Sequence, residues 1–239
     1  MNKLVSCIRD IFRKTDKKAL LILSSTVVLL TLYIYHGKHG SFMNFRQLFS
    51  KPEIYDLSSY VFEYLACFVL LFIVPLLLVK FVLKESPVKY GLKPGDMKFG
   101  VISTLIAIVV LIPFLYSGSL VPGMQATYPQ ARSVIGNFKL FAILEFYYLF
   151  YYIGWEFFFR GFMLFGLRDK FGALAAILLQ TIPSCLMHIG KPEVETLGSI
   201  VAGIGFGYLA LRTGSIIYPV IIHLFVGIFT DLLIMIRLS

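Results

Sequence analysis

The fold of this chain is decided by residues 154–161, which read Gly154-Trp155-Glu156-Phe157-Phe158-Phe159-Arg160-Gly161. They place a carboxylate and a guanidinium four residues apart inside a long apolar run. Side chains at positions i and i+4 share one face of an α-helix, with Cβ atoms about 5–6 Å apart. The two groups therefore form one polar spot on an apolar helix, and the rest of the chain must surround that spot.

The amino-acid composition indicates that much of the chain is surrounded by lipid. The chain has 239 residues, of which 58% are hydrophobic and only 15% are charged. So few charges cannot cover the surface of a soluble globular protein. The net charge of +9 does not indicate nucleic-acid binding, because Lys and Arg cluster in short segments between apolar runs. We therefore expect an all-α, polytopic membrane helix bundle whose partner is the lipid bilayer, with no nucleic acid.

Apolar runs predict about seven transmembrane helices. Their ranges are 19–35, 57–79, 99–116, 138–167, 172–189, 193–211 and 215–236. Basic residues gather before the first run, in residues 1–18, and the positive-inside rule places this end in the cytoplasm. We divide the chain into an N-terminal anchor with two spans (residues 1–89) and a membrane core that carries the site (residues 90–239). We expect the protein in a bacterial cytoplasmic membrane.

An ionisable pair at membrane depth is costly to bury and predicts a functional site. Two histidines follow it, His188 at the end of the fifth run and His223 within the seventh. A carboxylate can take a proton from water, imidazoles can hold that water or stabilise an oxyanion, and an arginine can keep the carboxylate ionised. Glu156, Arg160, His188 and His223 are therefore the candidate catalytic residues for hydrolysis of a peptide bond.

Two other interpretations fit the same residues. Glu156, His188 and His223 could bind zinc, since one carboxylate and two histidines form a known catalytic ligand set, although no His-Glu-x-x-His helix is present. The pair Glu156–Arg160 could instead be a structural ion pair that packs two helices. If the glutamate activates water by itself, we expect no cofactor.

The order of the motifs is a further indication. Residues 156–161 are followed by His188 at a helix end, by Tyr208-Leu209-Ala210-Leu211-Arg212-Thr213-Gly214-Ser215, and by His223. This order resembles the CAAX-protease and bacteriocin-processing family of intramembrane endopeptidases, over roughly residues 90–236. The family pattern is Glu-Glu-x-x-x-Arg, then Phe-x-x-x-His, then His-x-x-x-Asn or Asp. The resemblance implies a glutamate-dependent or metal-dependent endopeptidase that cleaves a membrane-associated protein or peptide.

The chain departs from this pattern at three positions. Trp155 stands where the family has its first Glu, the position usually assigned as the general base, and Glu156 matches the second Glu. Ser184 replaces the Phe of the second motif. Gly227 replaces the last residue of the third, with Asp231 one turn further along. Asp231 is also the one Asp within a predicted span, so a paired-aspartate site is not expected.

The departure at the first Glu leaves the identity of the base open. Either Glu156 has taken over that role or another acid has. Glu193 and Glu195, just after the first histidine, are the nearest rivals, whereas Glu145 lies about 16 Å away along the same helix. The alternative function is a catalytically silent relative that acts as a membrane scaffold or handles a small solute or lipid. Convergence of the acid and both histidines on one space would favour the protease.

Overall fold

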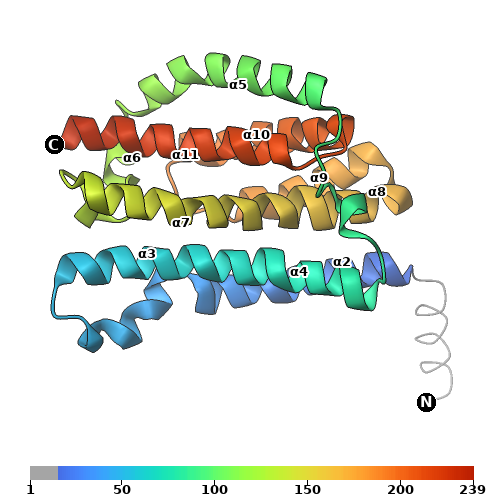
Figure 1. The fold of residues 1–239 in the computed structure, drawn as a ribbon, viewed down its shortest axis with the longest axis horizontal. Coiled ribbons are helices and arrows are strands. Elements are labelled where there is room, and N and C mark those ends of the chain that lie inside the picture. The colour runs from blue at the N-terminus through green and yellow to red at the C-terminus, as the bar shows by residue number, and fades with distance from the viewer. Residues whose placement is uncertain (1–15) are drawn as a thin grey trace.

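The computed structural model describes residues 16–239, which form a bundle of helices joined by short turns (Figure 1). The all-α, polytopic architecture predicted from the sequence is confirmed. The predicted basic flank before residue 16 lies outside the described residues.

The first two spans form an N-terminal helical hairpin. Helix α2 (Lys17–Leu32) begins after Asp16, whose carboxylate accepts a hydrogen bond of 2.9 Å from the backbone N–H of Ala19. This satisfies one of the free N–H groups at the helix start. The remaining segments of the hairpin are a π-helical turn η1 (Tyr33–Gly37), a 3-10 segment η2 (His39–Leu48), α3 (Pro52–Phe68), π-helical η3 (Val69–Ile73), α4 (Val74–Leu77) and π-helical η4 (Leu78–Val82).

The second part of the chain supplies the other spans. A 3-10 turn η5 (Pro87–Tyr90) leads into α5 (Met97–Gly118), which Asp96 caps by accepting from the N–H of Phe99. The short segments α6 (Pro122–Thr127) and η6 (Arg132–Val134) follow. The longest run then consists of α7 (Phe138–Glu156), the π-helical segment η7 (Phe157–Phe165) and α8 (Gly166–Phe171). The last three helices are α9 (Ala173–Leu186), α10 (Glu193–Thr213) and α11 (Ile217–Leu238).

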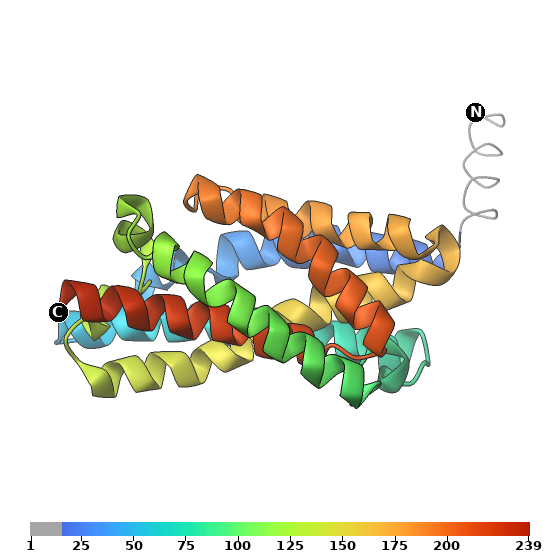
Figure 2. The same cartoon turned by 90° about the horizontal axis from the view of Figure 1, so that it is seen from above.

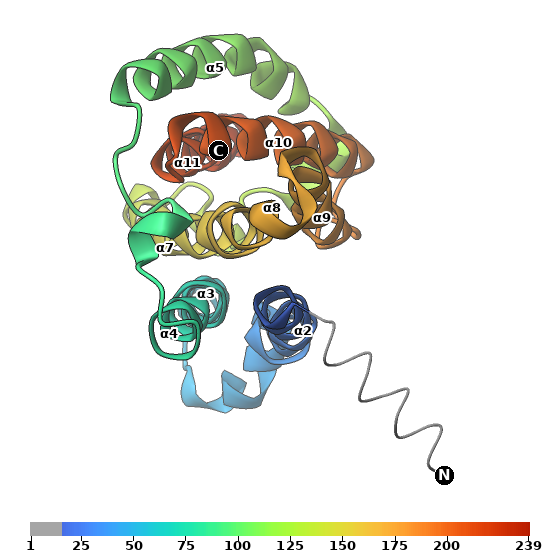
Figure 3. The ribbon, with the colours of Figure 1, turned by 90° about the vertical axis from the view of Figure 1, so that its right-hand side faces the viewer.

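The helices lie in layers, with the α7–η7–α8 run near the middle (Figure 3). The hairpin α2–α3 packs on one side of this run, and α10 and α11 pack on the other. Helix α5 covers α11 from outside and crosses it obliquely when the bundle is seen from above (Figure 2). The same view shows that the turn between α9 and α10 stops short of the end of the bundle where the C-terminus lies. The middle run is thus enclosed on most sides.

The outer surface is suited to a lipid bilayer. Five helical runs in the described part are long and apolar enough to cross a membrane: Lys17–Leu48, Pro52–Val82, Met97–Gly118, Glu193–Thr213 and Ile217–Leu238. Helix α9 is a shorter apolar helix, and the α7–η7–α8 run carries the charged residues of the centre. Each predicted span corresponds to one of these seven segments. Helix α5 exposes many large apolar side chains, among them Leu105, Ile106 and Val109. Such a large exposed apolar surface is unusual in a soluble protein and is typical of contact with lipid.

Candidate active site

The acid and the arginine of residues 154–161 lie at the junction between two types of helix. Glu156 is the last residue of α7, and Arg160 lies in the π-helical segment η7. Glu156 is 0% exposed and Arg160 is 1% exposed. Every residue of η7 is buried. Single-turn π-helical insertions are frequent at functional sites, and here the π-helical segment places the arginine in the interior of the bundle.

Small residues on both sides of the motif allow this burial. Gly154 lies against the backbone of α3, where an added Cβ would come within 3.0 Å of the carbonyl oxygen of Cys67. Gly161 lies against the carbonyl oxygen of Tyr90 in the same way, also at 3.0 Å. Backbone atoms cannot move aside as a flexible side chain can. Both glycines are therefore needed for the close approach of neighbouring segments to the motif.

The carboxylate of Glu156 holds two basic groups on one oxygen. Its Oε1 accepts a hydrogen bond of 3.2 Å from Nη1 of Arg160 and one of 2.6 Å from Nδ1 of His223 in α11. The predicted direct pairing of Glu156 with Arg160 is confirmed. The other oxygen, Oε2, has no hydrogen-bond partner among the described residues, and neither has Nε of Arg160. One acceptor and one donor are thus unpartnered at the centre of the bundle.

Aromatic rings hold the two basic groups in place. The ring of His223 lies 4.4 Å from that of Tyr152 and 5.7 Å from that of Phe206, measured between centroids. The guanidinium carbon of Arg160 is 5.5 Å from the centroid of the Phe206 ring. Cations are attracted to the faces of aromatic rings at such distances. Tyr152 of α7 and Phe206 of α10 therefore orient the polar centre, in addition to filling space.

His188 lies beside Trp155, at the end of α9. Its Nδ1 donates to the backbone carbonyl of Ser184 at 2.8 Å, so Nε2 is left with a lone pair. The indole ring of Trp155 meets the imidazole edge to face, with centroids 5.5 Å apart. Trp155 is 2% exposed. The structure thus places Glu156, Arg160 and His223 in direct contact, whereas His188 contacts the residue that replaces the first Glu of the family pattern.

The other departures from the pattern also have a structural counterpart. The hydroxyl of Tyr152 lies against Gly227, at a place where any Cβ would overlap with it. Tyrosine therefore occupies the space in which the family carries an Asn or Asp side chain. Asp231, one turn further along α11, makes no hydrogen bond with the site and lies near Glu145 of α7, and the carboxyl oxygens of both acids have no hydrogen-bond partner among the described residues. Both acids are buried, and this acid pair was not predicted.

The two rival acids have other surroundings. Glu193 is exposed at the start of α10. Glu195 accepts hydrogen bonds from Nζ of Lys191 and from the hydroxyl of Tyr128, at 2.8 and 2.7 Å. Burial would lower the pKa of Lys191, but Glu195 together with Tyr151 and Glu63 raises it above its ordinary value, so the lysine stays charged. Glu195 is thus engaged in an ion pair at the α9–α10 turn.

A cavity of about 400 Å³ lies at the end of the bundle that carries the α9–α10 turn and extends to Trp155, but Glu156, Arg160, His188 and His223 are not among its lining residues. Trp155 and Tyr151 line its inner part, and Lys191, Lys38 and His39 are among its outer residues. The side chain of His39 is 47% exposed. Its Nδ1 lies 2.8 Å from Oε2 of Glu63, and its ring stacks on Tyr60.

The zinc alternative has little geometric support. In residues 16–239, no three His, Cys, Asp or Glu side chains are grouped so that they could hold a metal ion. Oε1 of Glu156 is already shared by Arg160 and His223, and a guanidinium beside the carboxylate disfavours a second cation. The contacts of Glu156 therefore favour a role other than that of a zinc ligand.

Comparison with known proteins identifies a family over part of the chain. Residues 136–229, which include Glu156, Arg160, His188 and His223, match the family model described as type II CAAX prenyl endopeptidase Rce1-like. No curated protein and no solved structure matches the chain. The match begins just before α7 and ends within α11, so it includes the four candidate residues. The resemblance of this chain to the CAAX-protease family of intramembrane endopeptidases is thus confirmed.

Proposed function

We propose that the chain is an intramembrane endopeptidase in which Glu156 activates the attacking water. The observation that carries this proposal is the asymmetry of the Glu156 carboxylate. One oxygen is held by Arg160 and His223, and the other has no partner in the described part of the chain. An oriented carboxylate with one available acceptor oxygen is the arrangement that a general base requires.

Each neighbouring group then has a role. Arg160 donates a hydrogen bond to the carboxylate of Glu156 in an apolar surrounding, and its unpartnered Nε–H can stabilise negative charge that develops on the peptide carbonyl oxygen. His223 donates through Nδ1 to Glu156 and fixes its orientation. His188 donates through Nδ1 to a backbone carbonyl, so its Nε2 can accept a hydrogen bond from the water or carry a proton to the leaving amine.

The substrate that we propose is a membrane-associated protein or peptide, as expected for the CAAX-protease type. The cavity lined by Trp155 would bring such a substrate to the residue next to Glu156. Lysines gather at the opposite end of the bundle, at the start of α2 and in the segment from the end of η4 to the start of α5, so the positive-inside rule favours a cavity that faces away from the cytoplasm. We retain the cytoplasmic N-terminus, the bacterial membrane and the division at residues 89 and 90 as part of this proposal.

One observation favours the second candidate, a catalytically silent relative that acts as a scaffold or handles a small solute or lipid. Trp155 is buried at the position of the first motif Glu and fills the space beside His188. A site closed in this way could keep the ion pair Glu156–Arg160 for packing alone.

An assay of peptide cleavage by the reconstituted protein distinguishes the two proposed functions. The parent and the variants Glu156→Ala, His188→Ala and His223→Ala are placed in liposomes with a panel of membrane-anchored peptides, and products are identified by mass spectrometry. The variant His36→Ala, at an exposed histidine, is the matched control. The protease predicts a loss of at least about 100-fold in the three site variants and none in the control. Absence of cleavage by a folded parent over the whole panel would favour the silent relative.

A further inference from the structure

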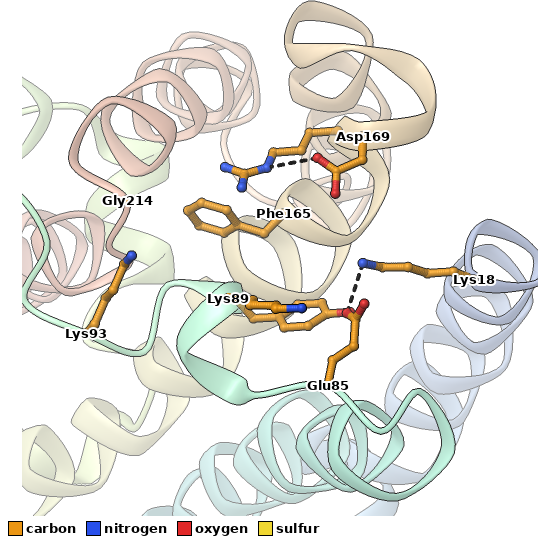
Figure 4. Close-up of a pocket in the computed structure, with 9 residues that line it drawn as sticks. Lys18, Glu85, Lys89, Lys93, Phe165, Asp169 and Gly214 are labelled. Carbon is orange, nitrogen blue, oxygen red and sulfur yellow. Dashed lines mark hydrogen bonds and ion pairs between the residues drawn. The ribbon is translucent and has the colours of Figure 1, made fainter.

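A second cavity lies at the end of the bundle opposite the one that leads to Trp155. It has a volume of about 350 Å³, within the usual range of small-ligand sites. Its walls come from separate parts of the chain: Lys18 at the start of α2, the segment from Glu85 to Lys93, Phe165 with Arg168 and Asp169 from η7 and α8, and Gly214 at the turn before α11 (Figure 4). The N-terminal hairpin and the membrane core thus share this pocket.

Each acidic group of the pocket has a basic partner, although the side chain of Asp169 is 77% exposed. Oε2 of Glu85 accepts from Nζ of Lys18 at 2.9 Å and from the hydroxyl of Tyr90 at 2.6 Å. Oδ1 of Asp169 lies 3.5 Å from Nε of Arg168. Partial burial would raise the pKa of Glu85, but the hydrogen bonds from Tyr90 and Lys18 outweigh it and lower that pKa. Glu85 is therefore ionised at neutral pH, as its pairing with Lys18 requires.

Two lysines of the pocket have no acidic partner, so the pocket carries more positive than negative charge. Lys89 and Lys93 make no ion pair with any described residue. Figure 4 shows Lys93 beside Gly214 on one side of the pocket and the pair Lys18–Glu85 on the other. Four basic and two acidic side chains line the cavity, so it can receive an anion of charge −1 to −2.

Aromatic rings form the inner wall of the pocket. Phe165 is 5% exposed and Tyr90 is 1% exposed. The guanidinium carbon of Arg168 lies 4.9 Å from the centroid of the Phe165 ring, and Nζ of Lys18 lies 5.3 Å from that of Tyr90. Those two cations are therefore held by both a carboxylate and a ring. An anion with a short apolar attachment would meet the two free lysines and these rings together.

We propose that this pocket binds the phosphate group of an anionic phosphate ester at the membrane surface. Lysine binds phosphate as a mobile point charge, and basic pockets between membrane helices recognise lipid head groups in this way. The glycerol headgroup of an acidic phospholipid and a soluble phosphate ester present the same chemistry. A phosphate group bound in this pocket would contact both the N-terminal hairpin and the membrane core, next to Phe165 of η7. This inference does not depend on the proposed protease activity.

Thermal unfolding of the full chain in neutral detergent tests the proposal, with the fluorescence of Trp155, the one tryptophan of the chain, as the signal. The probes are dioctanoyl phosphatidylglycerol, dioctanoyl phosphatidylcholine, dioctanoylglycerol and inorganic phosphate at constant ionic strength. We expect phosphatidylglycerol to raise Tm by roughly 5–10 °C at 100 times its Kd, and dioctanoylglycerol to have no effect. A comparable rise with inorganic phosphate alone would identify a soluble phosphate ester as the ligand.

Matched double variants decide whether the pocket is responsible. Lys89→Gln/Lys93→Gln removes the two unpaired lysines, and Lys84→Gln/Lys98→Gln removes the same charge from exposed positions outside the pocket on the same side. The first variant should melt like the parent without probe and lose at least about half of the shift that the probe causes, whereas the second should keep it. The proposal would be overturned if both double variants lost the same part of the Tm shift. It would also be overturned if phosphatidylglycerol and phosphatidylcholine raised Tm equally, or if no phosphate probe changed Tm.

Discussion

Replacement of Arg160 by alanine gives the sharpest test of the buried centre. The guanidinium is 1% exposed, donates to Glu156 and stacks near Phe206. The change Arg160→Ala would leave the carboxylate of Glu156 in an apolar surrounding with His223 as its remaining partner. Removal of one partner of a buried ion pair costs about 3–5 kcal/mol, because the other charge stays desolvated. We expect a loss of this size in the free energy of unfolding.

The corresponding fall in Tm is roughly 6–20 °C, since about 1 kcal/mol shifts Tm by about 2–4 °C in a chain of this size. Trp155 is adjacent to Glu156 and reports the unfolding through its fluorescence. The control is Arg212→Ala, which removes an ion pair with Asp96 of 3.0 Å whose side chains are 47% and 40% exposed. Solvent and salt screen such a pair, so its loss should change Tm little. If Arg160→Ala melts like Arg212→Ala, the pair at the centre is not buried as described.

Further predictions concern the neighbouring residues. Trp155→Glu should create or raise cleavage of a membrane-anchored peptide, because the new carboxylate would lie beside His188; a folded variant without any gain would contradict a simple loss of the base. Gly227→Ala should lower both Tm and cleavage, since its Cβ would displace the Tyr152 hydroxyl, and adding Tyr152→Phe should restore part of both. Because the pKa of Glu85 is lowered from 4.5 in the folded protein, its contribution to stability is complete above that value and is lost as the pH falls through the folded pKa. The difference in Tm between the parent and Glu85→Gln should therefore shrink between about pH 6 and about pH 3, and a difference that stays constant would argue against the ion pair.

The spans and the central ion pair could be predicted from local sequence. Apolar runs set the positions of the helices, since their length must match the hydrocarbon core. The contact between Glu156 and Arg160 follows from spacing along one helix, and the structure has it at 3.2 Å. Such features depend on residues that are near one another in the chain.

Contacts between helices were harder to predict, because they depend on the relative rotation and depth of two segments. The pairs His39–Glu63 and Glu145–Asp231 each join residues from different segments, and neither was expected from sequence. The π-helical segment η7 adds to the difficulty, since it changes which residues share a face after Glu156. The placement of His188 against Trp155 likewise follows from how α9 packs on η7.

The most direct test of the central claim compares two glutamates that differ in their surroundings. Glu156→Gln and Glu195→Gln both replace a carboxylate by an amide of the same shape and keep an oxygen that can accept a hydrogen bond. Peptide cleavage in liposomes is measured for both variants, and Tm confirms that each is folded. We predict that Glu156→Gln lowers kcat by at least about 100-fold, because the amide cannot take a proton from water, while Glu195→Gln stays within about threefold of the parent. Loss of cleavage in Glu195→Gln with full activity in Glu156→Gln would show that the wrong acid has been assigned as the base.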